Sequence, residues 1–192
     1  MSTAKKTETP IDEAQYLAAE LNSDIKHEYI DGNVYAMSGA SKNHRTLCGN
    51  IFSLLHNYLK DKPCKPSWDA RVKAAANYFY PDIVVDCDEQ STADSLYAQQ
   101  PKIIVEVLSR TTRHMDRGAK LLSYINIPSL QEYVLVEQEF ASIDVLRRSD
   151  GWVSRHYTLG ESIYFESIDL HVSVDAIYHS VDNEDVTEFL AK

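Results

Sequence analysis

Hydrophobic and polar residues alternate along the chain with two periods, which indicate its helices and strands. Apolar positions at helical spacing predict helices over residues 11–21, 41–60 and 110–125, and a last helical turn near 174–178. Short β-prone runs predict strands at residues 69–75, 81–87, 102–109, 130–138 and 162–167. Turn signals at residues 31–32 and 149–151 predict two hairpins. This order predicts an α/β or α+β domain in which helices flank one mixed sheet.

The predicted strand at residues 102–108 carries an acidic residue among apolar ones. Apart from Glu106 it is apolar on both faces, so we expect it to be central and buried. The Glu106 carboxylate would lose its hydration there unless a cation, a metal ion or a proton compensates. Asp82, at the start of the strand before it, raises the same question. Two such acids on neighbouring strands can hold one Mg²⁺ ion, but a capped carboxylate or a buried ion pair explains either acid equally well.

The predicted helix at residues 110–125 is basic on one side. Its stripe, at intervals of three and four, consists of Arg110, Arg113, Arg117, Lys120 and Tyr124. Five basic residues against two acidic ones give residues 102–126 a net charge of +3, which suits phosphate groups. The helix also has an apolar line, formed by Met115, Ala119, Leu122 and Ile125. If that line packs on the sheet, Lys120 and the basic face are plain solvated surface, so both interpretations stay open.

Composition and charge limit the domain organisation and the classes of protein that fit this chain. With 192 residues, 44% of them hydrophobic, we expect one domain over residues 11–179, between a flexible N-terminal stretch (1–10) and an acidic C-terminal tail (180–192). The net charge of −10 argues against a protein that binds nucleic acid or membranes by charge alone. No segment has the roughly 20 apolar residues of a membrane span or the pattern of a signal peptide. Three scattered cysteines predict no disulfide framework and no zinc site, and hence a cytoplasmic location.

Several segments together resemble one known family. They are HEYIDGNVYAMS from residue 27, SKNHR from residue 41, YPDIVV from residue 80, and KIIVEVLSRTTRHMDRGAKLLSYINIPSLQEYVLV from residue 102. In this order and spacing they resemble the Uma2 family of restriction-endonuclease-like proteins, also called DUF820, from about residue 11 to residue 178. The family is similar to nucleases of the PD-(D/E)XK fold. The resemblance therefore implies a restriction-endonuclease-like mixed sheet flanked by helices, and a Mg²⁺-dependent site with Mn²⁺ as the alternative ion.

The resemblance also implies which acidic residues form the site. Asp82 matches the aspartate of the motif, and Glu106 matches its second acid. Together with the backbone carbonyl of Val107, they are expected to hold the metal ion. Glu28 matches an N-terminal acid that serves as a further ligand or holds a metal-bound water. These residues would be catalytic in a nuclease of this kind.

The basic residues of the site depart from the simplest form of the motif. Leu108 stands where that form has its lysine, and the resemblance implies that Lys120 on the following helix takes this role. Arg113 and Arg117 are expected to bind flanking phosphates. His44 matches a recurring histidine of the family, and its role stays open between a functional one and a structural one at the start of a helix.

The implied function is that of an endonuclease that hydrolyses DNA phosphodiester bonds. We expect a homodimer, because cutting both strands usually requires two sites. Two other classes remain: a catalytically inactive nucleic-acid-binding or regulatory module on the same scaffold, and an interaction protein whose acids are structural. The complete set of Glu28, Asp82, Glu106 and Lys120 favours catalysis. Given the net charge of −10, such a nuclease should depend on its metal ion even to hold DNA.

Overall fold

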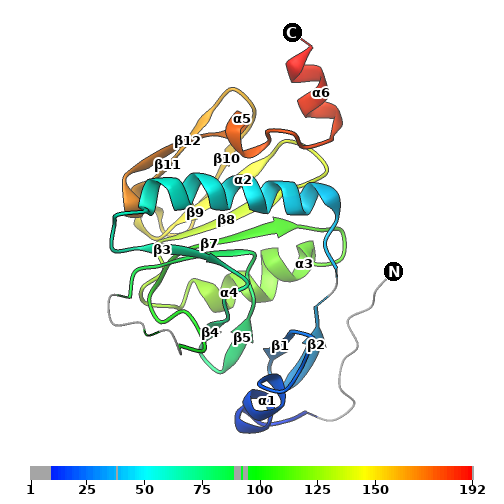
Figure 1. Ribbon diagram of the computed structural model, residues 1–192, viewed down its shortest axis with the longest axis vertical. Coiled ribbons are helices and arrows are strands. Elements are labelled where there is room, and N and C mark those ends of the chain that lie inside the picture. Colours follow the sequence, from blue (N-terminus) through cyan, green and yellow to red (C-terminus); the bar gives the residue numbers. More distant parts are fainter. Residues whose placement is uncertain (1–9, 38, 89–91, 93–94, 192) are drawn as a thin grey trace.

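The central sheet of the protein is mixed, as the sequence predicts (Figure 1). The computed structural model describes residues 10–37, 39–88, 92 and 95–191. In this part of the chain the central sheet has six strands in the order β10-β9-β8-β7-β6-β3. Strands β7 and β8 run parallel, and the other neighbours are antiparallel. The strands are β3 (Lys65–Trp68), β6 (Ile83–Asp86), β7 (Pro101–Leu108), β8 (Glu132–Glu137), β9 (Ile143–Arg147) and β10 (Ser154–Tyr157).

Two smaller antiparallel sheets and a set of helices surround the central sheet. One small sheet has the order β2-β1-β5-β4, and the other pairs β11 with β12. Their strands are β1 (His27–Ile30), β2 (Asn33–Ala36), β4 (Val72–Ala74), β5 (Asn77–Phe79), β11 (Ser162–Phe165) and β12 (Leu170–Ser173). The helices are α1 (Glu13–Glu20), α2 (Lys42–Leu59), α3 (Arg113–Met115), α4 (Leu121–Tyr124), α5 (Val174–Ile177) and α6 (Glu184–Leu190), with a π-helical turn (Asp116–Lys120) between α3 and α4.

Strand β7 lies between β6 and β8 and separates two cores, which confirms its predicted central position. Ile103 and Val105 face one core, which they share with Leu55 of α2. Ile104 faces the other core, which contains Tyr124 of α4. Helix α2 extends across one side of the central sheet (Figure 1). Because successive side chains of β7 point to opposite faces of the sheet, this strand contacts α2 on one face and α4 on the other. Both helical segments carry candidate site residues.

The segment at residues 110–125 differs most from its prediction. It begins at Arg113, and its middle is a π-helical turn, not an α-helix. Ala119 and Leu122 of the predicted apolar line are exposed, whereas Lys120 is buried. A helical wheel drawn at about 100° per residue assumes an α-helix, and the wider π turn changes which side chains face the sheet. Of the two interpretations that the sequence left open, the one in which Lys120 is plain solvated surface is therefore wrong.

The cysteine prediction is also wrong. Cys64 and Cys87 form a disulfide. Cys64 immediately precedes β3 and Cys87 immediately follows β6, and these antiparallel strands pair from Lys65 opposite Asp86 onward. Strand β3 was not predicted, because Pro63 and Pro66 suggested only the end of a helix. Without that strand, nothing in the sequence places the two cysteines opposite each other, and the cytoplasmic location inferred from unpaired cysteines loses that support.

Other differences lie at the edges of the domain. Strand β5 was not predicted, and the C-terminal tail, expected to be a solvated end, contains α6 with Val186 buried. The predicted flexible stretch at 1–10 lies, except for residue 10, outside the described residues. Residues 89–91 and 93–94, which fall between the strands predicted at 81–87 and 102–109, also lie outside them. Within the described residues, no helix has both the length and the apolar character to cross a membrane.

Candidate functional site

Lys120 lies at the centre of a buried cluster of carboxylates. Its Nζ is 2.8 Å from Glu28 Oε1, 3.1 Å from Glu106 Oε1 and 3.2 Å from Asp116 Oδ1. The hydroxyl of Tyr124 donates a hydrogen bond to the same Glu106 oxygen at 3.1 Å. The cluster joins strand β1, the central strand β7 and the segment that contains the π-helical turn. We call these five residues the lysine cluster.

Burial and charge act in opposite directions in the lysine cluster. Burial raises the pKa of Glu106 well above its ordinary value, although the charge of Lys120 lowers it. Burial also raises the pKa of Asp116. For Lys120, burial favours the neutral amine, but the charges of Glu106, Glu28 and Asp116 outweigh it and raise the pKa well above its ordinary value. Lys120 is therefore a permanently charged group whose position is fixed by its acidic partners.

A second group of polar atoms adjoins the lysine cluster at the next residue of β7. Asp82, which lies just before β6, accepts a hydrogen bond from the backbone N–H of Val107 at 2.7 Å. The same carboxylate oxygen is 3.3 Å from Nε2 of His44. Burial lowers the pKa of His44, but its hydrogen bond to Asp82, the charge of Asp82 and a hydrogen bond to the Val107 backbone carbonyl raise it above its ordinary value. We call Asp82, Val107 and His44 the aspartate group.

Helix α2 brings a sulfur atom to the aspartate group. The Ser41 side chain caps α2 by accepting a hydrogen bond from the His44 N–H, which fixes the first turn. Cys48 follows His44 by one helical turn, and its Sγ is 3.5 Å from His44 Nδ1. Among the described residues, one set of three or more His, Cys, Asp and Glu side chains brings its ligand atoms within 4.8 Å of one another, and this set is His44, Cys48 and Asp82.

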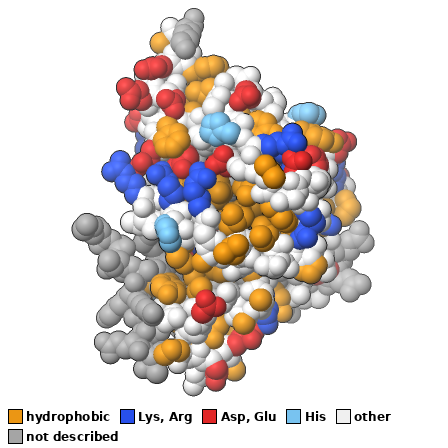
Figure 2. Space-filling model, turned by 180° about the vertical axis from the view of Figure 1, so that it is seen from behind, with side chains coloured by type: hydrophobic (Ala, Val, Ile, Leu, Met, Phe, Trp, Pro, Cys, Tyr) orange, Lys and Arg blue, Asp and Glu red, His pale blue; other side chains and the backbone are white. Residues whose placement is uncertain are grey.

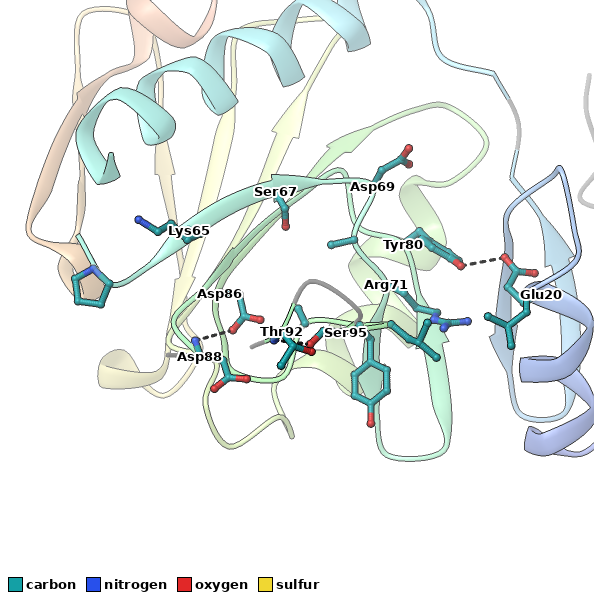
Figure 3. A pocket seen from close by; sticks show the side chains of 16 residues that line it. Glu20, Lys65, Ser67, Asp69, Arg71, Tyr80, Asp86, Asp88, Thr92 and Ser95 are labelled. Carbon is teal, nitrogen blue, oxygen red and sulfur yellow. Dashed lines mark hydrogen bonds between the residues drawn. The ribbon is translucent and has the colours of Figure 1, made fainter. Parts of the chain in front are cut away.

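The aspartate group borders one of two neighbouring cavities. The smaller cavity, of about 230 Å³, is lined by Met37, His44, Arg45, Cys48, Trp68, Asp69, Tyr80, Pro81 and Asp82. A larger cleft of about 820 Å³ shares Asp69 and Tyr80 with it. In Figure 3, Tyr80 reaches Glu20 of α1 at one end of this cleft, and Asp86 lies toward the other end. Asp82 lines only the smaller cavity, and no residue of the lysine cluster lines either of the two.

The basic residues of the predicted stripe have different environments. Arg113 Nη2 lies 2.5 Å from Glu137 Oε2. Arg117 Nη2 lies 3.3 Å from Glu137 Oε1 and 2.8 Å from Asp144 Oδ2. Basic side chains on the face shown in Figure 2 likewise gather beside acidic ones. Lys120 is instead buried in the lysine cluster. The stripe is therefore not an unpaired basic surface, and its residues do not form one continuous phosphate-binding surface.

The structure brings together most of the residues expected from the sequence, but in two groups. Glu28, Glu106 and Lys120 share the lysine cluster, whereas Asp82 and Val107 belong to the aspartate group. In the part of the chain that the structure describes, Lys120 makes no ion pair with Asp82, although the charge of Asp82 contributes to the raised pKa of Glu106. The two groups are therefore electrostatically coupled neighbours.

Sequence reasoning missed two members of the site, Asp116 and Cys48, whereas it placed Tyr124 on one stripe with Lys120. Asp116 stands four residues before Lys120, so this spacing could have indicated that they share a face. Cys48 stands four residues after His44, and this spacing also was available. Nothing in the sequence relates Glu28 to Asp116, because the fold alone brings them to one lysine.

Comparison with known proteins decides the family. The profile of the Uma2 family, described as "Putative restriction endonuclease", matches residues 13–173, which is most of the chain. This chain belongs to the Uma2 family. An uncharacterized protein of Synechocystis sp. (slr1290) is 34% identical over 172 residues, with 87% of this chain and 90% of that protein covered. A second Synechocystis protein, sll1609, is 33% identical over 130 residues, with 65% of this chain and 73% of that protein covered.

A solved structure shares the fold of this Uma2 protein. It is the crystal structure of a protein from Anabaena variabilis that is described as a putative nuclease belonging to DUF820. The two structures superpose with a TM-score of 0.75, and the match covers 88% of this chain and 98% of that one. Their sequences are only 16% identical, so the likeness shows a common fold.

Proposed function

We propose that this Uma2 protein is a Mg²⁺-dependent endonuclease that hydrolyses DNA phosphodiester bonds, with Mn²⁺ as the alternative ion. The observation that carries the proposal is the buried Lys120, which Glu28 and Glu106 hold beside Asp82 and Val107. A fixed positive charge next to carboxylate oxygens, with Asp82 in the wall of a cavity, suits a phosphodiester and a divalent ion together. The family and the shared fold agree with this reading.

The donor set fits a hard divalent ion. The carboxylate of Asp82 and the backbone carbonyl of Val107 both lie against the His44 imidazole, and Glu106 is the neighbouring residue on β7. Asp82, Glu106 and the Val107 carbonyl would hold the ion. When bound, Mg²⁺ would supply a Lewis acid that lowers the pKa of a water and offsets phosphate charge.

The residues of the chain would orient the substrate around this ion. Lys120 keeps its proton at neutral pH, because the surrounding carboxylates raise its pKa. It would therefore donate hydrogen bonds to the attacking water or to the scissile phosphate, and it would not act as the base. Glu28 and Asp116 would keep Nζ in place. Arg113 and Arg117 would bind flanking phosphates by exchanging their present carboxylate partners, and a homodimer would supply the second site for the second strand.

Cleavage of a plasmid tests the proposal. The wild-type chain should nick or linearise plasmid DNA with Mg²⁺ or Mn²⁺ and not with EDTA. Glu106→Gln and Asp82→Asn should each lower the rate by at least about a hundredfold. Glu132→Gln is the matched control, since Glu132 is equally buried but accepts its hydrogen bonds from Ser167 and the Glu166 backbone, outside both groups. It should cleave like the wild type.

Other outcomes distinguish the remaining functions. Equal cleavage by all four proteins would reject the site assignment. No cleavage together with salt-dependent retention of DNA would favour a nucleic-acid-binding module. Neither cleavage nor retention would favour an interaction protein in which the buried acids are structural.

A further inference from the structure

The aspartate group has ligand atoms of a kind that Mg²⁺ does not require. Besides the Asp82 carboxylate, it presents the imidazole of His44, and the neighbouring Cys48 adds a thiol. Mg²⁺ binds oxygen almost exclusively and keeps several waters. Imidazole nitrogen and thiol sulfur are instead typical ligands of borderline divalent ions such as Zn²⁺ and Co²⁺. The chemistry of the group therefore favours a different ion from the one that the family resemblance implies.

The distances suit a single ion of that class. His44 Nε2 and Asp82 Oδ2 are 3.3 Å apart, close to the separation of about 3.3 Å between two ligands bound at about 2.05 Å in a tetrahedral site. All three ligand atoms lie within 4.8 Å of one another. In a tetrahedral site, a nitrogen bound at about 2.05 Å and a sulfur bound at about 2.3 Å lie about 3.6 Å apart. Cys48 Sγ lies 3.5 Å from Nδ1 of the His44 imidazole. A side-chain rotation that shortens the widest separation by up to about 1.2 Å would therefore bring the three ligands onto one ion.

The structure around the group supports each ligand. His44 and Cys48 are one turn apart on the capped start of α2, so they project from the same face of a long helix. Asp82 is held by the Val107 N–H, a backbone contact of the central strand. His44 Nε2 lies against Asp82 Oδ2, and one cation could take the place between these two atoms.

The cavity leaves room for a further ligand. It borders His44, Cys48 and Asp82 and has a volume of about 230 Å³, enough for several waters at about 30 Å³ each. Three protein ligands with an open position toward a cavity are the pattern of a catalytic metal site, whereas structural zinc sites are closed. Arg45, which lines the same cavity, would offset the charge of an anion that takes the open position.

We propose that His44, Cys48 and Asp82 form a binding site for one borderline transition-metal ion, of the Zn²⁺ or Co²⁺ class, with its open position toward the 230 Å³ cavity. The proposal goes beyond the proposed function and shares only Asp82 with it, because this ion would be a second one beside the Mg²⁺ that Asp82, Glu106 and Val107 would hold. It makes His44 a metal ligand and makes Cys48 the residue that sets the choice of ion. Glu106 remains in the lysine cluster and is not a ligand of this ion.

Cobalt spectroscopy of the full chain tests the site without DNA. After treatment with EDTA and its removal, the protein is titrated with Co²⁺. A thiolate-to-cobalt charge-transfer band in the near ultraviolet is expected at one ion per chain. Zn²⁺ should displace the cobalt stoichiometrically, whereas Mg²⁺ should need at least about a tenfold higher concentration to do so.

Variants assign the band to particular residues. Cys48→Ser and Cys48→Ala should lose it, and His44→Gln should weaken cobalt binding at least about tenfold. The double variant Cys64→Ser/Cys87→Ser should keep the band, because those cysteines are elsewhere. Glu132→Gln, whose hydrogen bonds come from Ser167 and the Glu166 backbone, should keep it too. Circular dichroism establishes that each variant is folded, and protection of Cys48 from alkylation by Zn²⁺ in the wild type gives a second readout.

The outcomes separate this inference from the nuclease proposal. A missing band in the wild type, or a band that survives in both Cys48 variants, would overturn the site even if plasmid DNA is cleaved with Mg²⁺. Easy displacement of cobalt by Mg²⁺ would overturn the claimed preference. A cobalt band that follows Cys48, in a protein that does not cleave DNA, would support the site and reject the nuclease.

Discussion

A single lysine balances three carboxylates in the interior of this protein. Glu28, Glu106 and Asp116 all lie within 3.2 Å of Lys120 Nζ, so full ionisation would leave two uncompensated negative charges. Burial raises the pKa of Glu106 and of Asp116, which brings the cluster closer to neutrality. Burying these charged groups therefore costs stability of the fold, and it holds the positive charge of Lys120 in one fixed position.

This balance predicts opposite effects for two substitutions at the lysine cluster. Lys120→Met should lower the free energy of unfolding by about 3–5 kcal/mol at pH 7, because buried carboxylates lose their cation. Glu106→Gln should leave it unchanged or raise it, since a neutral side chain is what burial favours and the amide oxygen still accepts from Tyr124. Urea unfolding measures both. An equal loss in the two variants would mean that Glu106 is the principal counter-ion of Lys120.

At the scale of elements, helices α1 and α2 and most strands of the central sheet followed from the hydrophobic period, whereas β3 and β5 did not. The site followed only in part. The central strand β7 could be predicted because Glu106 stands among apolar residues on both faces. The burial of Lys120 could not, because the π-helical turn at Asp116–Lys120 breaks the 100° spacing on which a helical wheel depends. The Cys64–Cys87 pair likewise depends on the register of β3 and β6, which no local pattern contains.

The disulfide attaches an edge strand to the central sheet. Strand β3 lies at the end of the strand order, and β6 is its one neighbour in the described sheet. The bond closes a loop between residues 23 apart, which restricts the unfolded chain. Replacing both cysteines by serine should lower the free energy of unfolding by about 3 kcal/mol in urea titrations.

The reduced wild-type chain provides the comparison for this prediction. It should unfold at the same urea concentration as the double-serine variant, since both lack the bond. Cys48→Ser is the matched control for loss of a cysteine, and it should keep the difference between the oxidised and reduced chains. No difference between oxidised and reduced wild type would show that the bond does not stabilise the fold.

At the scale of the whole molecule, buried phenols form a second large set of titratable groups. Burial raises the pKa of Tyr80 to about 12 and raises that of Tyr124 and Tyr133 well above the ordinary value. Burial likewise raises the pKa of Tyr16 and Tyr178. Tyr178 lies in the core on the α2 side of the central sheet, and Tyr124 and Tyr133 lie in the core on its other side. Tyr16 lies in a third, smaller core with Tyr29 and Tyr78, so alkaline pH acts on all three cores.

The sign of the resulting pH dependence follows from proton counts. Above the ordinary tyrosine pKa of 10.0, phenols ionise in the unfolded chain but stay neutral in the folded one, so the unfolded state binds fewer protons. The free energy of unfolding should therefore fall as pH rises from 10 toward 12, by up to about 1.4 kcal/mol per pH unit for each buried tyrosine. Tyr133→Phe should make this slope shallower, whereas Phe79→Leu, which destabilises the same core without removing a phenol, should leave it unchanged. Urea titrations at a series of alkaline pH values measure the slope, and an equal slope in wild type and Tyr133→Phe would mean that Tyr133 ionises in the folded protein.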